Sequence, residues 1–96
     1  MEKQPCVYLL ASQHYGTLYT RVTSNLLKRV WEHKTHSVDG FTKKYDVTVL
    51  VWYEIHESME SAIKRKKSLK NWNQAWKIRL LEETNSQWRD LYKQLL

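Results

Sequence analysis

The first third of the chain alternates short apolar runs with polar breaks, and this pattern predicts a β-hairpin followed by a helix. Residues 7–11 and 17–22 are rich in β-branched and aromatic side chains, and the break between them contains Gly16, which suits a tight turn. Ser24 follows and is expected to cap a helix, because its hydroxyl can accept hydrogen bonds from first-turn amides. Helical spacing then predicts an inward-facing stripe of Leu26, Leu27, Val30 and Trp31.

The other side of this predicted helix is polar. Arg29 and His33 are four residues apart and therefore share one face, beside an expected weak surface pair of Lys28 and Glu32. Periodicity alone describes this face as solvated.

The next part of the chain predicts a loop and a third strand. Residues 34–46 contain Gly40 and few apolar positions, so a loop is expected there. In residues 47–54 the apolar side chains at odd-numbered positions point to one face, while Leu50 and Trp52 point to the other. A strand that is apolar on both sides is expected to be covered on both sides.

The last forty residues predict three helices. Ser58 is expected to cap a helix that runs to about Lys70, followed by helices over about residues 73–83 and 88–95. Three tryptophans in this region are expected to pack between these helices and the sheet: Trp72, Trp76 and Trp88. The predicted fold class is α+β, a three-stranded sheet with flanking helices.

Composition indicates one domain that covers residues 1–96 and can bury a core without disulfides. Cys6 is the single cysteine of the sequence, which fits a reducing compartment. The polar start and the lack of a long apolar run predict a cytoplasmic protein with no membrane contact. The net charge of +6 favours polyanionic partners, although many domains of this size are equally basic.

Tyr8, Tyr19 and Arg29 have a spacing that resembles the GIY-YIG nuclease domain, with an arginine ten residues after the second tyrosine. His33, four residues further, is also common in that family. Later segments resemble a branch of small, single-domain bacterial members: Phe41–Tyr45, Leu50–Glu54, Ala62–Arg65, Lys70–Trp72, Trp76–Lys77 and Asn85–Leu91. The resemblance covers nearly the whole chain and implies a DNA-processing role such as repair.

The resemblance implies a phosphodiesterase site made of Tyr8, Tyr19, Arg29 and His33. In the family a tyrosine lies near the attacking water, the arginine steadies the phosphate, and a glutamate on a later helix holds a divalent metal that polarises it. Without the resemblance, the two tyrosines are equally well explained as a cross-strand packing pair.

Two positions depart from the family pattern. Lys66 stands at the position of the metal-binding glutamate, and Arg21 stands where the second motif has glycine. An ammonium roughly 6 Å from a divalent cation costs about 5 kcal/mol at an effective dielectric of about 20, so metal binding is expected to fail. Lys66 also follows the apolar stripe of its helix, so it either faces a cleft or lies along the core edge with its amine in water. Glu54, at the end of the third strand, is an alternative metal ligand if it approaches the cleft.

Five cations are candidates for contacts with nucleic-acid phosphates: Arg21, Lys43, Lys44, Lys66 and Lys70. Phe41 and Tyr45, beside two of them, either stack on bases or fix the loop to the core. Three hypotheses remain: a DNA-binding domain with lost or impaired metal catalysis, an active Mg²⁺-dependent endonuclease on branched or nicked DNA, and a non-catalytic protein-interaction module. The first requires no cofactor, and the second requires Mg²⁺.

Overall fold

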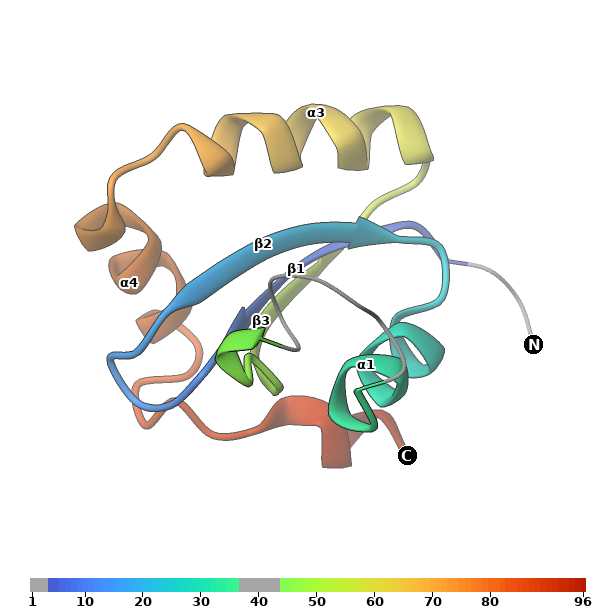
Figure 1. Ribbon diagram of the computed structural model, residues 1–96. Helices are drawn as coiled ribbons and strands as arrows, with labels where there is room; N and C mark the ends of the chain where they lie inside the picture. The colour runs from blue at the N-terminus through green and yellow to red at the C-terminus, as the bar shows by residue number, and fades with distance from the viewer. Residues whose placement is uncertain (1–3, 37–43) are drawn as a thin grey trace.

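A three-stranded antiparallel sheet forms the centre of the molecule (Figure 1). The computed structural model describes residues 4–36 and 44–96. The strands are β1 (Cys6–Ala11), β2 (Leu18–Thr23) and β3 (Val49–Ile55), in the order β2-β1-β3. All six residues of β1 are buried, because this strand is paired on both sides and covered on both faces.

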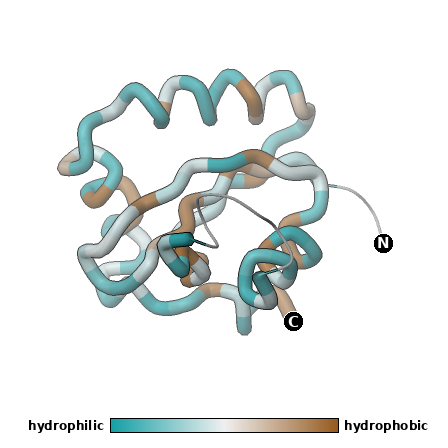
Figure 2. The backbone as a smooth tube through the Cα atoms, viewed as in Figure 1, coloured by the Kyte–Doolittle hydropathy of each residue, from teal (hydrophilic) through white to brown (hydrophobic). Residues whose placement is uncertain are grey.

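Helices cover both faces of the sheet, as the predicted α+β class requires. Figure 1 shows α3 (Met59–Lys70) and α4 (Gln74–Glu82) on one side, and α1 (Leu26–Lys34) with the 3-10 helix η1 (Leu91–Leu95) on the other. Ala62, Leu69 and Leu81 pack on the first face, and Leu26 and Val30 on the second. The outer turns of α3 are mainly hydrophilic (Figure 2). None of the described helices has the length and apolar character needed to cross a lipid bilayer.

The turn of the predicted hairpin requires its glycine. The Gly16 amide donates to the carbonyl oxygen of Gln13 at 2.9 Å, and the Thr17 amide donates to the Ser12 hydroxyl at 3.0 Å. A Cβ at position 16 would clash with the side chains of Ser12 and Gln13. The close packing of this turn therefore selects glycine.

A β-bulge in β3 corrects the predicted alternation of that strand. Leu10 pairs with Leu50, whereas Leu9 pairs with Trp52, so Val51 is an extra residue. Val51 and Trp52 consequently both pack on the α3 face, and residues 47, 49, 51 and 53 do not share one face. The strand also begins at residue 49 rather than 47.

Helix ends follow the predictions closely at α3 and less closely elsewhere. Ser58 caps α3 by accepting from the Ser61 amide, as predicted. Asn25, not Ser24, caps α1, because its side-chain oxygen accepts from the Lys28 amide at 3.2 Å. The last predicted helix is a short 3-10 helix that begins at residue 91, and Trp88 precedes it with a positive φ of 55°. Lys34 belongs to α1, and residues 37–43 of the predicted loop lie outside the described part of the chain.

Three side chains are placed differently from the prediction. Trp31 and Trp76 were expected to be buried, but 53% and 52% of their surfaces are exposed. Periodicity alone placed His33 on a solvated face, whereas the family resemblance placed it in the site; the side chain is 4% exposed and packs against the sheet. Arg29, not Lys28, pairs with Glu32, at 3.4 Å.

Candidate functional site

Tyr8 and His33 form the buried centre of the candidate site. Tyr8 lies on β1 with its side chain on the α1 face of the sheet, and it is fully buried. Its phenolic oxygen is 3.3 Å from Nε2 of His33, and the two ring centroids are 6.3 Å apart. Helix α1 places His33 there because Leu26 and Val30 bury the same side of the helix.

Tyr19 and Arg21 join this centre from the edge strand β2. Tyr8 is directly opposite Arg21 in the sheet, and Leu10 is opposite Tyr19. Paired residues, and residues two apart on one strand, project from the same face, so these four side chains share the α1 face. The Tyr19 ring meets His33 edge to face with centroids 6.3 Å apart. The guanidinium of Arg21 lies 5.5 Å from the Tyr19 centroid. The two tyrosines are thus diagonal neighbours, not a directly opposed pair.

Arg29 brings a second guanidinium to the site from α1. It lines a surface pocket of about 270 Å³ at the start of the helix, together with Thr23, Ser24, Asn25, Lys28 and Glu32. Amides of the first helical turn carry partial positive charge, so this end of the pocket suits an anion. We call this the α1 pocket. Lys28 had not been predicted as a site residue. Its position in the first turn of the helix, beside amides that favour an anion, is the feature of the sequence that indicates such a role.

Burial and the two arginines set the protonation states of the centre. Burial raises the pKa of the Tyr8 phenol well above its ordinary value, and the charges of Arg21 and Arg29 offset part of that rise. Burial lowers the pKa of His33, and the charges of Arg29 and Arg21 lower it further. At neutral pH a neutral phenol therefore faces a neutral imidazole, and the imidazole tautomer sets which of the two groups donates the hydrogen bond.

Lys66 and Lys70 belong to the opposite layer, on α3. Burial comes first among the causes that lower the pKa of Lys66, followed by the charges of Lys70 and Arg21. The Arg21 charge therefore acts both on Lys66 and on Tyr8. The structure brings together Tyr8, Tyr19, Arg21, Arg29 and His33, which we call the tyrosine cluster. Lys66 and Lys70 are on α3, in the other layer.

Of the two predicted loop cations, the structure describes Lys44. Lys44 is exposed, with its ammonium 5.4 Å from the centroid of the Tyr45 ring. Lys43 and Phe41 lie outside the described residues.

The family described as the GIY-YIG catalytic domain matches residues 4–79. This chain belongs to the GIY-YIG family. Its nuclease-like domain also resembles a UPF0213 protein of Staphylococcus haemolyticus, with 30% identity over 71% of this chain and 83% of the relative. A UPF0213 protein of Staphylococcus aureus is 31% identical over the same shares.

The fold agrees with a solved structure of a similar protein. The solution structure of a UPF0213 protein from Bacillus halodurans superposes with a TM-score of 0.57 over 94% of this chain and 95% of that chain, at 21% identity. This similarity concerns the fold alone, which it supports.

The described residues of this GIY-YIG domain do not offer a fitting set of metal ligands. Among residues 4–36 and 44–96, no group of three or more His, Cys, Asp or Glu side chains could hold an ion. Glu32 is paired with Arg29, and Glu54 is opposite Val7, on the face away from Tyr8. The possibility that Glu54 supplies a ligand to the tyrosine cluster is therefore wrong.

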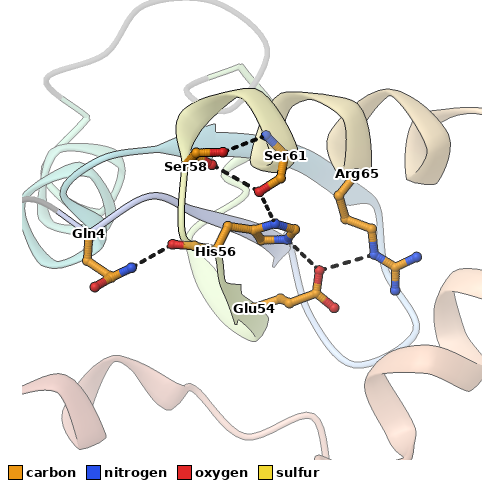
Figure 3. A network of polar contacts seen from close by, with 6 residues as sticks. All are labelled: Gln4, Glu54, His56, Ser58, Ser61 and Arg65. Carbon is orange, nitrogen blue, oxygen red and sulfur yellow. Dashed lines mark hydrogen bonds and ion pairs between the residues drawn. The ribbon is translucent and has the colours of Figure 1, made fainter.

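Glu54 instead belongs to a polar network between β3 and α3 (Figure 3). Its Oε1 lies 2.6 Å from Nε2 of His56 and 3.2 Å from Nε of Arg65. Nδ1 of His56 lies 2.9 Å from the Ser61 hydroxyl, which donates to the Ser58 carbonyl. The sequence offered no Ser-His-acid motif, because these side chains meet only once α3 folds back on the sheet. We assign the network to fixing the first turns of α3.

Proposed function

We propose that this GIY-YIG domain binds DNA through its phosphates and does not use metal-dependent hydrolysis. The observation that carries the proposal is the pair of guanidinium groups, Arg21 and Arg29, beside a neutral Tyr8 and His33, where the described residues supply no carboxylate set. GIY-YIG domains generally act on nucleic acids, which supports the polyanionic partner. Lys66, at the position where the family pattern has a glutamate, adds a further cation at the edge of β2.

The α1 pocket is the proposed seat of one phosphate. Arg29 can form paired hydrogen bonds with phosphate oxygens, and Lys28 and the first-turn amides add positive charge. A phosphate there competes with Glu32 for Arg29, and that surface ion pair is weak because both side chains are partly exposed. Arg21, Lys66 and Lys70 then offer successive charges along the edge of the sheet.

Salt-dependent binding to duplex DNA tests this proposal. Arg29→Ala should weaken binding and lower the slope of log K against log salt by about one, because one phosphate contact is lost. Glu32→Gln should strengthen binding, since it frees the Arg29 guanidinium. Lys64→Ala is the matched control, because Lys64 is exposed on α3 and pairs with Glu60. A DNA affinity that does not change with salt concentration, with Arg29→Ala or with Glu32→Gln would refute the phosphate site.

A plasmid nicking assay addresses the second candidate function, an active endonuclease, which the match to a catalytic domain favours. Wild-type protein should neither nick DNA with Mg²⁺ or Mn²⁺ nor require Mg²⁺ for binding. The double variant Arg21→Gly, Lys66→Glu restores both family residues and should gain measurable metal-dependent nicking. Robust nicking by the wild type would show that the protein is an active endonuclease. Negligible binding to DNA at moderate salt would instead favour a protein-interaction module.

A further inference from the structure

A second pocket lies on α4, on the opposite side of the sheet from Tyr8. It has a volume of about 210 Å³, and its lining is Trp72, Trp76, Arg79, Leu80 and Glu83. We call it the tryptophan pocket. Its size is below the roughly 300–1,000 Å³ of sites for drug-sized ligands, so it suits a single planar ring system.

Trp76 exposes a large aromatic surface in this pocket. Half of the side chain is accessible, and its main ring contact is with Trp72, at a centroid distance of 6.0 Å and an interplanar angle of 86°. An edge-to-face contact uses the edge of one ring and leaves faces of the pair available for another ring. Trp76 and Trp72 form a paired aromatic surface in one pocket, whereas a single exposed aromatic side chain needs no functional explanation.

The two tryptophans are held in position before any ligand arrives. The guanidinium of Arg65 lies 5.4 Å from the Trp72 centroid, and Glu54 fixes that guanidinium at 3.2 Å. Asn73, between the two rings in sequence, caps α4 by accepting from the Trp76 amide at 2.9 Å. A preorganised ring pair loses little conformational entropy when a ligand stacks on it.

The charges around the pocket suit a base with its phosphates outside. Arg79 offers a cation at the rim, whereas the Glu83 carboxylate would repel a phosphate but can accept a hydrogen bond from a base amino group. Lys77, also on α4, adds a cation; burial and then the charge of Lys70 lower its pKa. We propose that Trp76, supported by Trp72, stacks an unpaired base of a single-stranded nucleic acid; this deepens and rests on the proposed nucleic-acid binding.

The test compares a single strand with a hairpin duplex of equal nucleotide number. Trp76→Ala should raise the Kd for the single strand by about 5- to 100-fold, the loss of one stacked base, and leave the duplex Kd within about twofold. Trp76→Phe should retain most of the affinity. Trp31→Ala, at an equally exposed tryptophan that borders Lys28 of the α1 pocket, is the matched control and should leave the ratio of the single-strand Kd to the duplex Kd unchanged.

The outcomes separate this proposal from the previous one. If Trp76→Ala leaves single-strand affinity unchanged while Arg29→Ala weakens binding, the base-stacking site is refuted and the phosphate site stands. Equal losses for single strand and duplex also refute it, because a stacking site requires an unpaired base. A wild-type protein that binds neither nucleic acid overturns both proposals, and circular dichroism of each variant excludes misfolding as the cause.

Discussion

The hydroxyl of Tyr8 and Nε2 of His33 lie 3.3 Å apart inside the domain, joining the central strand to helix α1. Both side chains are less than 5% exposed. The contact therefore serves as a structural hydrogen bond as well as part of the candidate site, and its two roles can be separated by experiment.

Tyr8→Phe should lower the free energy of unfolding by about 1 kcal/mol, because it removes one buried hydrogen bond while keeping the ring. Tyr53→Phe is the control. Tyr53 is the neighbour of Tyr8 on β3, and its hydroxyl has no hydrogen-bond partner among the described residues, so its loss should change stability by only a few tenths of a kcal/mol. Urea unfolding measures both, and equal effects would mean that the Tyr8 hydroxyl contributes nothing through His33.

Stability should fall as the pH drops below about 6.5, the ordinary pKa of histidine, because the pKa of folded His33 is lower than that value. In that range the unfolded chain binds more protons at His33 than the folded chain, so acid favours unfolding. Thermal unfolding of wild type and His33→Gln over this pH range measures the effect, which the variant should reduce. Arg29→Ala should reduce it as well, since the Arg29 charge is the second cause of the shift. An unchanged pH profile in His33→Gln would place the dependence elsewhere.

Asn85→Ala should be among the most destabilising polar substitutions. The buried Asn85 amide donates to the carbonyl oxygens of Val51 and Arg89, at 3.0 and 2.9 Å, and accepts from the Arg89 amide at 2.9 Å. Its loss leaves several buried groups without partners and should cost roughly 2–4 kcal/mol of the free energy of unfolding. Asn25→Ala, which removes one helix cap, should cost about 1 kcal/mol. Chemical denaturation that ranks the two variants in the opposite order would contradict this account.

Thr20→Val should raise stability by about 1 kcal/mol. Thr20 is 3% exposed, and its hydroxyl has no hydrogen-bond partner among the described residues, so valine of the same shape removes a desolvation cost. Thr23→Val is the matched control on the same strand and should destabilise, because the Thr23 hydroxyl accepts from the Asn25 amide at 3.0 Å. A lower melting temperature for Thr20→Val would mean that its hydroxyl is satisfied.

The sequence predicted those features that depend on local patterns. Two runs rich in β-branched and aromatic residues, with Gly16 in the polar break between them, identified the hairpin. Ser58 marked the start of α3 correctly. The family spacing selected Tyr8, Tyr19 and Arg29 without a structure. Where two neighbours had equal capping chemistry, as at Ser24 and Asn25, the local pattern was insufficient, because the direction in which the chain leaves β2 decides between them.

Features that depend on tertiary contacts escaped prediction. Helical periodicity assigned Trp31 and Trp76 to the interior and His33 to the surface, since it weighs polarity and not the partner that each side chain meets. His33 is buried because Tyr8 supplies a hydrogen bond there. The network of Glu54, His56 and Arg65 likewise has no sequence signature, because it joins a strand end to a helix across a turn.

The extra residue in β3 decides which chemistry each side of the sheet can support. With a regular register, Glu54 would be opposite Cys6 and would project toward Tyr8; the bulge at Val51 shifts it by one position to the side of Arg65. A strand in which Val51 is kept but paired opposite Leu9, without the bulge, would therefore carry an acidic group across the sheet and alter the electrostatic character of both layers, without changing any residue of the tyrosine cluster.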